Sequence, residues 1–297
     1  MKEVIRAKID NPAITVLHRV DGPFSLVRGR VDYADYALID LNRLVADGTV
    51  FQSDWSKKEC LKLGLSDSGF NCTISNAPQD GIFYNNSRMR GAREKVRLIA
   101  TSWSSNLNKG FDTYLWMDQN LDWSKYQMTF IGNSPYSFEN IDTRAPQASA
   151  DLATELRRHD IFISASRNDP CSNSVLEALH SGLPVVGYDG GGTPELIGGG
   201  GRLFTSPDEI PEALRQIGAQ YEAYRSKIKV TSISEIGQRY IDFALEVRTS
   251  VRPRRPSQMQ KAVFNAKNLS LASRLWAQRY TRLRTALRNR VRPSRYN

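Results

Sequence analysis

The chain has 297 residues, which is enough for one large domain or two of average size. Hydrophobic residues make up 40% and charged residues 24%, as in globular proteins, so a disordered or fibrous class is excluded. The net charge is +10, but 14 of the 41 basic residues lie in residues 248–297, which contain no Asp or Glu, so the body is mildly acidic and the basic character belongs to one tail.

The cysteines and the first residues predict where the protein works. Cys60, Cys72 and Cys171 lack metal-ligand spacing and indicate a reducing compartment without disulfides. No stretch approaches 18 apolar residues, and the start contains acidic residues and a proline where a signal peptide needs an apolar run. We therefore expect a cytoplasmic protein.

Short apolar runs alternate with amphipathic segments of helix length, which predicts parallel strands joined by crossover helices. The first set is predicted to have strands at 13–17, 49–52 and 72–75 and helices at 31–45 and 55–63. Residues 80–94 are rich in Asn, Ser, Gly and Arg and are predicted to form a linker. Three strands leave much of a sheet uncovered unless another element packs there.

A second, fuller set is sufficient for a complete doubly wound domain. Its strands are predicted at 96–101, 127–131, 161–164, 184–188 and 202–204, with helices near 111–121, 148–158 and 172–181, and a short helix opened by Pro194. Helices at 209–225 and 234–247 follow. We expect domains at 1–90 and 91–232, a closing helix at 233–250 and a basic tail at 251–297.

Three loops after strands of the second set are predicted to form a ligand site, because ligands of open parallel sheets bind at the carboxyl ends of the strands. The run from Asp189 to Glu195 contains three glycines and opens a helix, so its amides can approach an anion. A polar turn places Lys109 at a helix start, where it would face a phosphate. The third loop leads into a helix with Glu177 between apolar neighbours. Each feature alone is more often structural.

Taken together, their order and spacing resemble the retaining glycosyltransferases with the two-domain GT-B fold, a group that includes sucrose synthases, glycogen synthases and bacterial mannosyltransferases. Asp169 and Glu177 are separated by seven residues, followed by a G-x-P-V-V strand at 182–186 and a GG-x-x-E loop at 191–195. The resemblance covers residues 18–243 and is strongest over 109–204.

The resemblance implies an α/β fold of two Rossmann-like, doubly wound domains, the first incomplete, with a basic helical tail. It implies that Asp169 contacts the sugar of a nucleoside-diphosphate sugar, that Glu177 accepts hydrogen bonds from the ribose, and that Lys109 neutralises the diphosphate without a metal or other cofactor. The expected donor contacts beside these are Ser104, Asn173, Ser174, Gly190, Gly191, Gly192, Thr193 and Glu195.

The chain departs from the family pattern at the donor site. Asp169 stands where the family commonly has Glu, and Trp103 and Ser104 stand where it usually has Arg, for which Arg167 is a candidate substitute. In the first half, His18 precedes Asp21 and Gly22 in a segment that resembles the loop facing the acceptor. His18 is thus a candidate catalytic residue, with a purely structural role as the equal alternative, and Asp21 is a weaker candidate.

These features predict a retaining hexosyltransferase that moves a sugar from a nucleoside-diphosphate sugar to a hydroxyl of a glycan, a lipid-linked acceptor or a small molecule, in cell-surface polysaccharide biosynthesis. Because the first domain is shorter than in the family, a catalytically silent sugar-nucleotide-binding subunit and a second chain that completes the domain are alternatives. A dinucleotide-dependent oxidoreductase would need a G-x-G-x-x-G after a first strand, and the sequence has none.

The basic tail is predicted to contain an amphipathic helix at 264–291. Its apolar residues lie three or four positions apart, and arginines lie mostly between them. The apolar residues are Ala272, Trp276, Tyr280, Leu283, Leu287 and Val291. Such a helix either docks on the anionic inner face of a membrane or packs against the first domain. Nucleic acid is not an expected partner, because the tail lacks a recognisable binding module.

Overall fold

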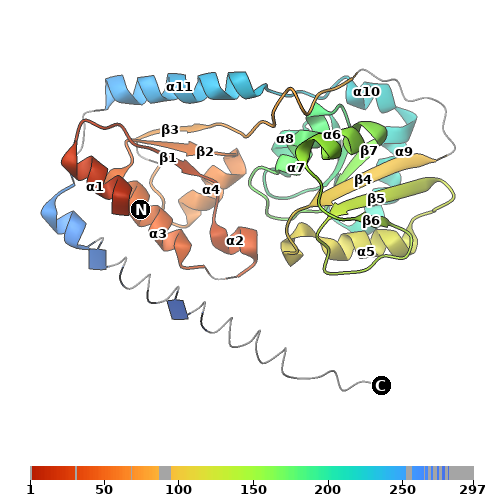
Figure 1. The fold of residues 1–297 in the computed structure, drawn as a ribbon, viewed down its shortest axis with the longest axis horizontal. Coiled ribbons are helices and arrows are strands. Elements are labelled where there is room, and N and C mark those ends of the chain that lie inside the picture. Colours follow the sequence, from red (N-terminus) through yellow and green to blue (C-terminus); the bar gives the residue numbers. More distant parts are fainter. Residues whose placement is uncertain are drawn as a thin grey trace.

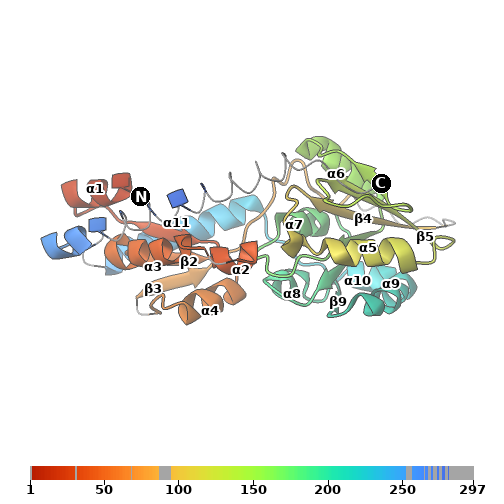
Figure 2. The same ribbon diagram turned by 90° about the horizontal axis from the view of Figure 1, so that it is seen from below.

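The computed structural model describes residues 2–30, 32–67, 69–86, 95–251 and 256–263, together with residues 265, 266, 269, 273, 276, 277 and 280. These residues form two α/β domains that lie side by side (Figures 1 and 2). Both sheets are parallel, as the alternation of apolar runs and amphipathic segments predicts.

The N-terminal domain has a three-stranded sheet in the order β1-β2-β3. Its elements are α1 (Lys2–Asp10), β1 (Leu17–Val20), α2 (Phe24–Arg28), α3 (Ala34–Val45), β2 (Gly48–Phe51), α4 (Asp54–Lys62) and β3 (Phe70–Thr73). The first strand begins later than the predicted 13–17, in register with Gly48. Val16 instead packs with Ile5 and Val45 between α1 and α3, which removes it from the sheet.

Helices α1 and α2 are not predicted from the sequence. Helix α2 has only five residues and ends at Gly29, whose φ of 63° is left-handed, so it is too short to show a period. The carboxylate of Asp35 accepts hydrogen bonds from the amides of Phe24 and Ser25 and fixes its start. Helix α1 is held by the buried ammonium of Lys8, which lies 2.6 Å from Asp47.

Helix α11 (Ile233–Ser250) covers one face of the N-terminal sheet, as Figure 1 shows. Its residues Ile236, Phe243 and Val247 form an apolar cluster with Val50 and other sheet residues. At Gly48 a Cβ atom would lie 2.8 Å from Val247, so the glycine permits this close approach. The face that three strands leave open is therefore buried by a helix that follows the second domain in sequence.

The C-terminal domain has a six-stranded sheet in the order β6-β5-β4-β7-β8-β9, which confirms the predicted Rossmann-like α/β class. The strands are β4 (Val96–Ser102), β5 (Tyr126–Gly132), β6 (Asp142–Arg144), β7 (Ile161–Ser164), β8 (Val185–Tyr188) and β9 (Gly201–Phe204). The helices are η1 (Leu107–Lys109), α5 (Phe111–Asn120), α6 (Ser149–Arg158), α7 (Asn173–His180), α8 (Thr193–Ile197), η2 (Pro207–Glu209), α9 (Ile210–Ala219) and α10 (Tyr221–Arg225).

Two details of this domain differ from the prediction. Strand β6 is present in the structure but was not predicted. Its three residues lie on a sheet edge and are all at least partly exposed, so they form no apolar run. The helix predicted at 209–225 is divided at Gln220, where φ is −128° and ψ is 36°, into α9 and α10.

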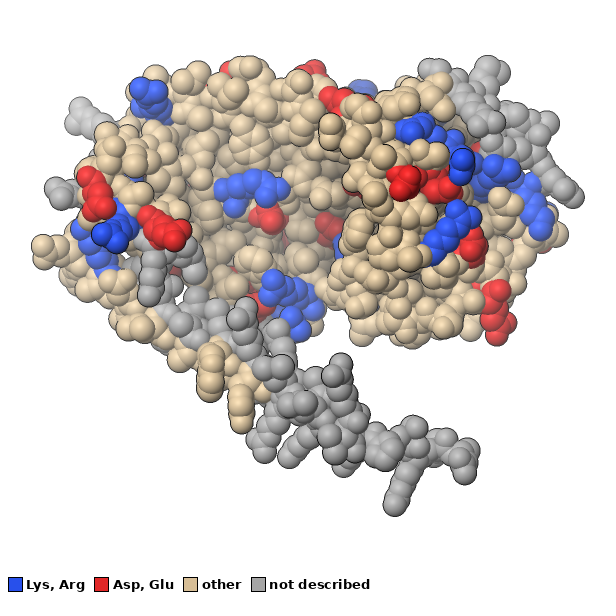
Figure 3. Space-filling model, in the orientation of Figure 1, with Lys and Arg blue, Asp and Glu red and all other residues tan. Residues whose placement is uncertain are grey.

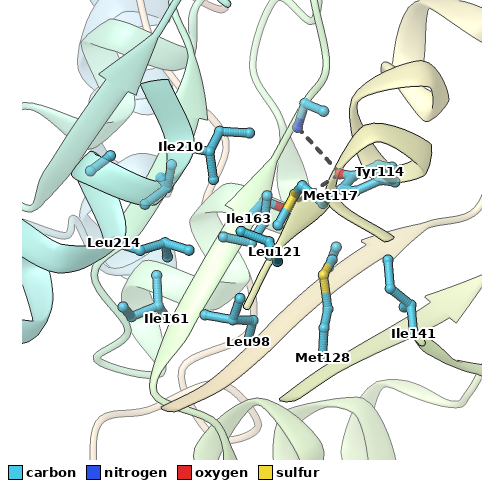
Figure 4. Packing of buried hydrophobic residues seen from close by; sticks show 14 of the residues in the cluster. Leu98, Tyr114, Met117, Leu121, Met128, Ile141, Ile161, Ile163, Ile210 and Leu214 are labelled. Atoms are coloured by element: carbon cyan, nitrogen blue, oxygen red, sulfur yellow. Dashed lines mark hydrogen bonds between the residues drawn. The ribbon is translucent and has the colours of Figure 1, made fainter. Parts of the chain in front are cut away.

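Buried apolar side chains fill both faces of the larger sheet. One cluster packs α5 and α9 against the strands, and Figure 4 shows Leu98, Met117 and Leu214 within it. The other packs α6, α7 and α8 on the opposite face. The hydroxyl of Tyr114 accepts a hydrogen bond from the amide of Ala165 at 3.2 Å, the dashed line in Figure 4, and so fixes the loop after β7 against α5.

The described part of the tail begins on the N-terminal domain. Residues 258–263 are helical and border a groove of about 410 Å³ that is also lined by Asp40, Arg43 and Leu44 of α3. Most of the amphipathic helix predicted at 264–291 lies outside the described residues; Trp276 and Tyr280 stack with ring centroids 5.6 Å apart. Among described residues, no helix has the length and apolarity needed to span a bilayer.

Candidate functional site

A cavity of about 270 Å³ lies at the carboxyl ends of β4 and β7, where the sequence predicts a ligand site. Its walls include six of the predicted site residues: Ser104, Lys109, Asp169, Asn173, Ser174 and Glu177. Ser102, Ser164, Ser166 and Ser172 add hydroxyl groups, and Trp103, which is 64% exposed, lies at the same cavity. The structure thus brings one cation, two carboxylates and several hydroxyls together.

Lys109 and Asp169 form an ion pair inside this cavity. The ammonium of Lys109 donates to Oδ2 of Asp169 at 2.7 Å, and the two side chains are 32% and 15% exposed. Oδ1 of Asp169 accepts from the amide of Cys171 at 3.3 Å. A phosphate that binds Lys109 therefore competes with the carboxylate that is predicted to hold the sugar.

The turn before Lys109 is positioned by both domains. Asn108 donates to the carbonyl oxygens of Leu26 and Val27, at 2.8 and 3.2 Å, at the end of α2. Gly110 has a φ of 74°, and a Cβ atom there would lie 2.1 Å from the carbonyl oxygen of Ala165. Only glycine fits between these loops, so the backbone fixes where the Lys109 side chain starts.

Glu177 lies on α7 where this cavity meets a larger one. The second cavity, of about 760 Å³, lies at the domain junction and is also lined by Asn173 and Glu177. Its other walls come from the segment after β3, from α11 and from Arg19 of β1. Burial raises the pKa of the Glu177 carboxyl to about 7.

This pKa predicts a stability change that Glu177→Gln removes. The raised pKa favours the protonated carboxyl in the folded state. The contribution of Glu177 to the free energy of unfolding is therefore complete below the unfolded pKa of 4.5 and is lost as pH rises through about 7. A shift of this size corresponds to an upper limit of about 3–4 kcal/mol in the free energy of unfolding. We expect urea unfolding between pH 5 and 8.5 to show this loss in the wild type and in Glu246→Gln, an exposed control, but not in Glu177→Gln. Parallel curves for all three would contradict it.

The glycine triplet does not line either cavity. A Cβ atom at Gly191 would lie 2.4 Å from the carbonyl oxygen of Asp169, and one at Gly192 would lie 2.1 Å from that of Pro170. The amide of Gly192 donates to the Asp169 carbonyl at 2.8 Å. In the described structure, Gly190, Gly191, Gly192 and the buried Thr193 thus pack behind the Asp169 loop, and their contact with a diphosphate stays a prediction.

Glu195 also lines neither cavity. Its two carboxylate oxygens accept hydrogen bonds from the amides of Asp54 and Trp55, at 2.8 and 2.7 Å, at the start of α4 in the N-terminal domain. The carboxylate is thus bonded to the other domain, and the donor contact of Glu195 stays a prediction.

His18 and Arg167 are not brought to either cavity. His18 is half-buried on β1, and its Nδ1 lies 3.0 Å from Nδ2 of Asn42. Burial lowers the pKa of His18, which favours a neutral ring. Arg167 forms an ion pair with Asp112. The candidate substitute for the family arginine is thus engaged elsewhere.

Arg19 and Asn76 line the junction cavity, although the sequence pattern does not single them out as site residues. Arg19 lies 2.8 Å from Asp21 and donates to Asn76 at 2.8 Å; Asn76 donates to Asn173 at 2.8 Å. These contacts connect β1 to α7 across the domain junction. Neighbouring residues of a strand point to opposite faces, so Arg19 lines the junction cavity and His18 does not. The signal for Arg19 was a charged residue near a strand end. The catalytic role of His18 stays a prediction.

No cluster of three or more His, Cys, Asp or Glu residues suited to a metal occurs in the described part of the chain. On the face shown in Figure 3, basic and acidic side chains lie mixed, and the surface is hollowed between the domains. The smaller cavity, of about 270 Å³, is a polar site, and Lys109 is the one cation in its described lining.

Solved glycosyltransferases are among the structures with a similar fold. Sucrose-phosphate synthase from Thermosynechococcus elongatus aligns with a TM-score of 0.59 and 15% identity, over 84% of this chain and 68% of that one. Anabaena Alr3699/HepE in complex with UDP and glucose aligns with a TM-score of 0.63 and 15% identity, over 80% and 72%. The fold is that of the GT-B glycosyltransferases.

Part of the C-terminal domain is similar in sequence to known glycosyltransferases. Residues 117–220 match the family described as Glycosyl transferases group 1, which confirms the predicted resemblance to glycosyltransferases. A stretch of 104 residues is 30% identical to the sulfoquinovosyl transferase SQD2 of Arabidopsis thaliana and covers 31% of this chain. That match spans only 20% of the relative's length.

Proposed function

We propose that this protein is a retaining glycosyltransferase that moves a hexosyl group from a nucleoside-diphosphate sugar to a hydroxyl acceptor. The observation that supports it most directly is the convergence of Lys109, Asp169 and Glu177 in one cavity at the carboxyl ends of parallel strands. A cation and two carboxylates match the three parts of such a donor: diphosphate, sugar and ribose.

Each residue has a distinct role in this proposal. The ammonium of Lys109 binds the diphosphate and stabilises the negative charge that grows on it as the glycosidic bond breaks. Glu177 accepts hydrogen bonds from the ribose hydroxyls and Asp169 from the sugar hydroxyls. The acceptor hydroxyl attacks from the face that the diphosphate leaves, and the diphosphate takes its proton, so the configuration is retained without a metal.

The neighbouring structures and the second cavity guide the choice of donor and acceptor to test. UDP and UDP-glucose are bound in the solved structures of Anabaena Alr3699/HepE, so a UDP-sugar is the first donor to test. The junction cavity of about 760 Å³ meets the smaller one at Glu177 and has room for an acceptor. A glycan or lipid-linked acceptor in cell-surface synthesis, reached at the inner face of a membrane through the basic tail, extends this proposal.

A binding-only subunit is the second candidate. It is favoured by the pairing of Lys109 with Asp169, because Lys109 is the one cation among the described lining residues and the expected arginine is absent. Such a subunit would bind nucleotide sugars but transfer sugar only after a second protein is added.

A donor panel tests the proposal. Transfer or hydrolysis of UDP-, GDP- and ADP-sugars should be measured with the wild type, with Glu177→Ala and with the exposed control Glu246→Ala. We expect one donor class to be used and Glu177→Ala alone to lose activity. Equal activity of wild type and Glu177→Ala would defeat the assignment of Glu177. In a thermal-shift measurement, stabilisation of the protein by NAD but not by UDP or GDP would favour an oxidoreductase.

A further inference from the structure

We infer that Glu195 is a positioning residue that holds the two domains together. The contact in question, which we term the interdomain cap, consists of the Glu195 carboxylate and the backbone amides of Asp54 and Trp55. Its effect on transfer rests on the proposed function, whereas its effect on domain arrangement does not.

The interdomain cap satisfies amides that a helix cannot satisfy itself. Helix α4 has nine residues, and its first amides have no partner within the helix. The amide of Ser56 donates to the side chain of Ser53 at 3.0 Å, which is a local cap. The amides of Asp54 and Trp55 instead donate to a residue about 140 positions later, in the other domain. A carboxylate that accepts two amides at the positive end of a helix is a favourable partner.

The surroundings of the cap are packed across the same junction. A Cβ atom at Gly192 would lie 3.1 Å from Cβ of Ser53, and one at Gly22 would lie 2.9 Å from Pro170. The hydroxyl of Ser56 donates to the carbonyl of Asp21 at 2.9 Å. The start of α4, the loop after β1 and the loop after β7 therefore form one contact region.

The cap is connected to the predicted sugar contact. Glu195 lies three residues after Gly192, whose amide donates to the carbonyl of Asp169 at 2.8 Å. The side chain of Asp169 lines the smaller cavity with Lys109 and Glu177, and all three belong to the C-terminal domain. Loss of the cap should thus change how the N-terminal domain meets the cavity. The predicted nucleotide contacts, which belong to the C-terminal domain, should stay in place.

Distance measurements test this directly. Spin labels at the exposed positions Tyr36→Cys and Asp208→Cys, in a Cys72→Ser background, report the separation of the domains by double electron–electron resonance. We expect Glu195→Ala to add a population at longer distance. Ser53→Ala is the matched control, because it removes the local cap of the same helix and should keep the wild-type distance.

Kinetics provide the second readout. We expect Glu195→Ala to reduce kcat about tenfold or more through misplacement of the N-terminal domain, with UDP affinity changed less than about threefold. An unchanged distance distribution in Glu195→Ala would overturn the inference whether or not transfer is detectable. If Glu195→Ala does not fold, Glu195→Gln is judged by the same distance criterion. Absence of any nucleotide-sugar activity in the wild type would defeat the proposed function and leave the distance test intact.

Discussion

Replacing Lys109 by Met is expected to reduce sugar transfer by about 10²–10³-fold, the loss typical when one group that stabilises transition-state charge is removed. Methionine keeps the length of the side chain and removes its charge. Among the described residues that line the cavity, no other cation could replace the ammonium. Arg167, which does not line the cavity, is paired with Asp112. UDP affinity should fall at least about tenfold, as for a lost charged hydrogen bond, by isothermal titration calorimetry.

Lys125→Met is the matched control for this substitution. Lys125 belongs to the same domain, is exposed and forms an ion pair with Asp122 at 2.8 Å, and neither residue lines the cavity. It should leave both transfer and UDP affinity as in the wild type. Wild-type UDP affinity in Lys109→Met would show that the diphosphate does not bind at Lys109.

Asp169→Asn is expected to change binding and transfer in opposite directions. The carboxylate of Asp169 lies 2.7 Å from the Lys109 ammonium, so a diphosphate must displace it to bind there. Removing the negative charge should increase UDP affinity by about threefold to tenfold, since a partly exposed ion pair contributes on the order of 1 kcal/mol. Transfer should fall by about 10–100-fold, because the amide is a weaker acceptor for the sugar hydroxyls.

Asp112→Asn is the control for this opposite response. It also breaks an ion pair with a basic residue, Arg167, in the same domain, but neither residue lines the cavity. UDP affinity should therefore stay unchanged. If Asp169→Asn weakens UDP binding as much as it weakens transfer, then Asp169 supports the nucleotide site instead of competing with the diphosphate.

Local sequence pattern is enough to predict the C-terminal domain and the residues at the centre of its site. Apolar runs and amphipathic segments alternate regularly there, so the parallel strands were predicted within about two residues, except for the short β6. In a parallel sheet the loops that follow the strands meet at one edge, so Lys109, Asp169 and Glu177 could be predicted to converge. These inferences need only local pattern and chain order.

The contacts of the remaining polar residues depend on how distant parts of the chain pack together. Glu195 caps a helix of the other domain, and the three glycines allow backbone packing behind Asp169. Arg19, and not His18, faces the junction cavity, because a shift of one residue along a strand reverses the face. Each of these contacts joins segments that lie up to about 140 residues apart in the sequence. A local pattern of apolar and polar residues does not indicate which distant surfaces will meet.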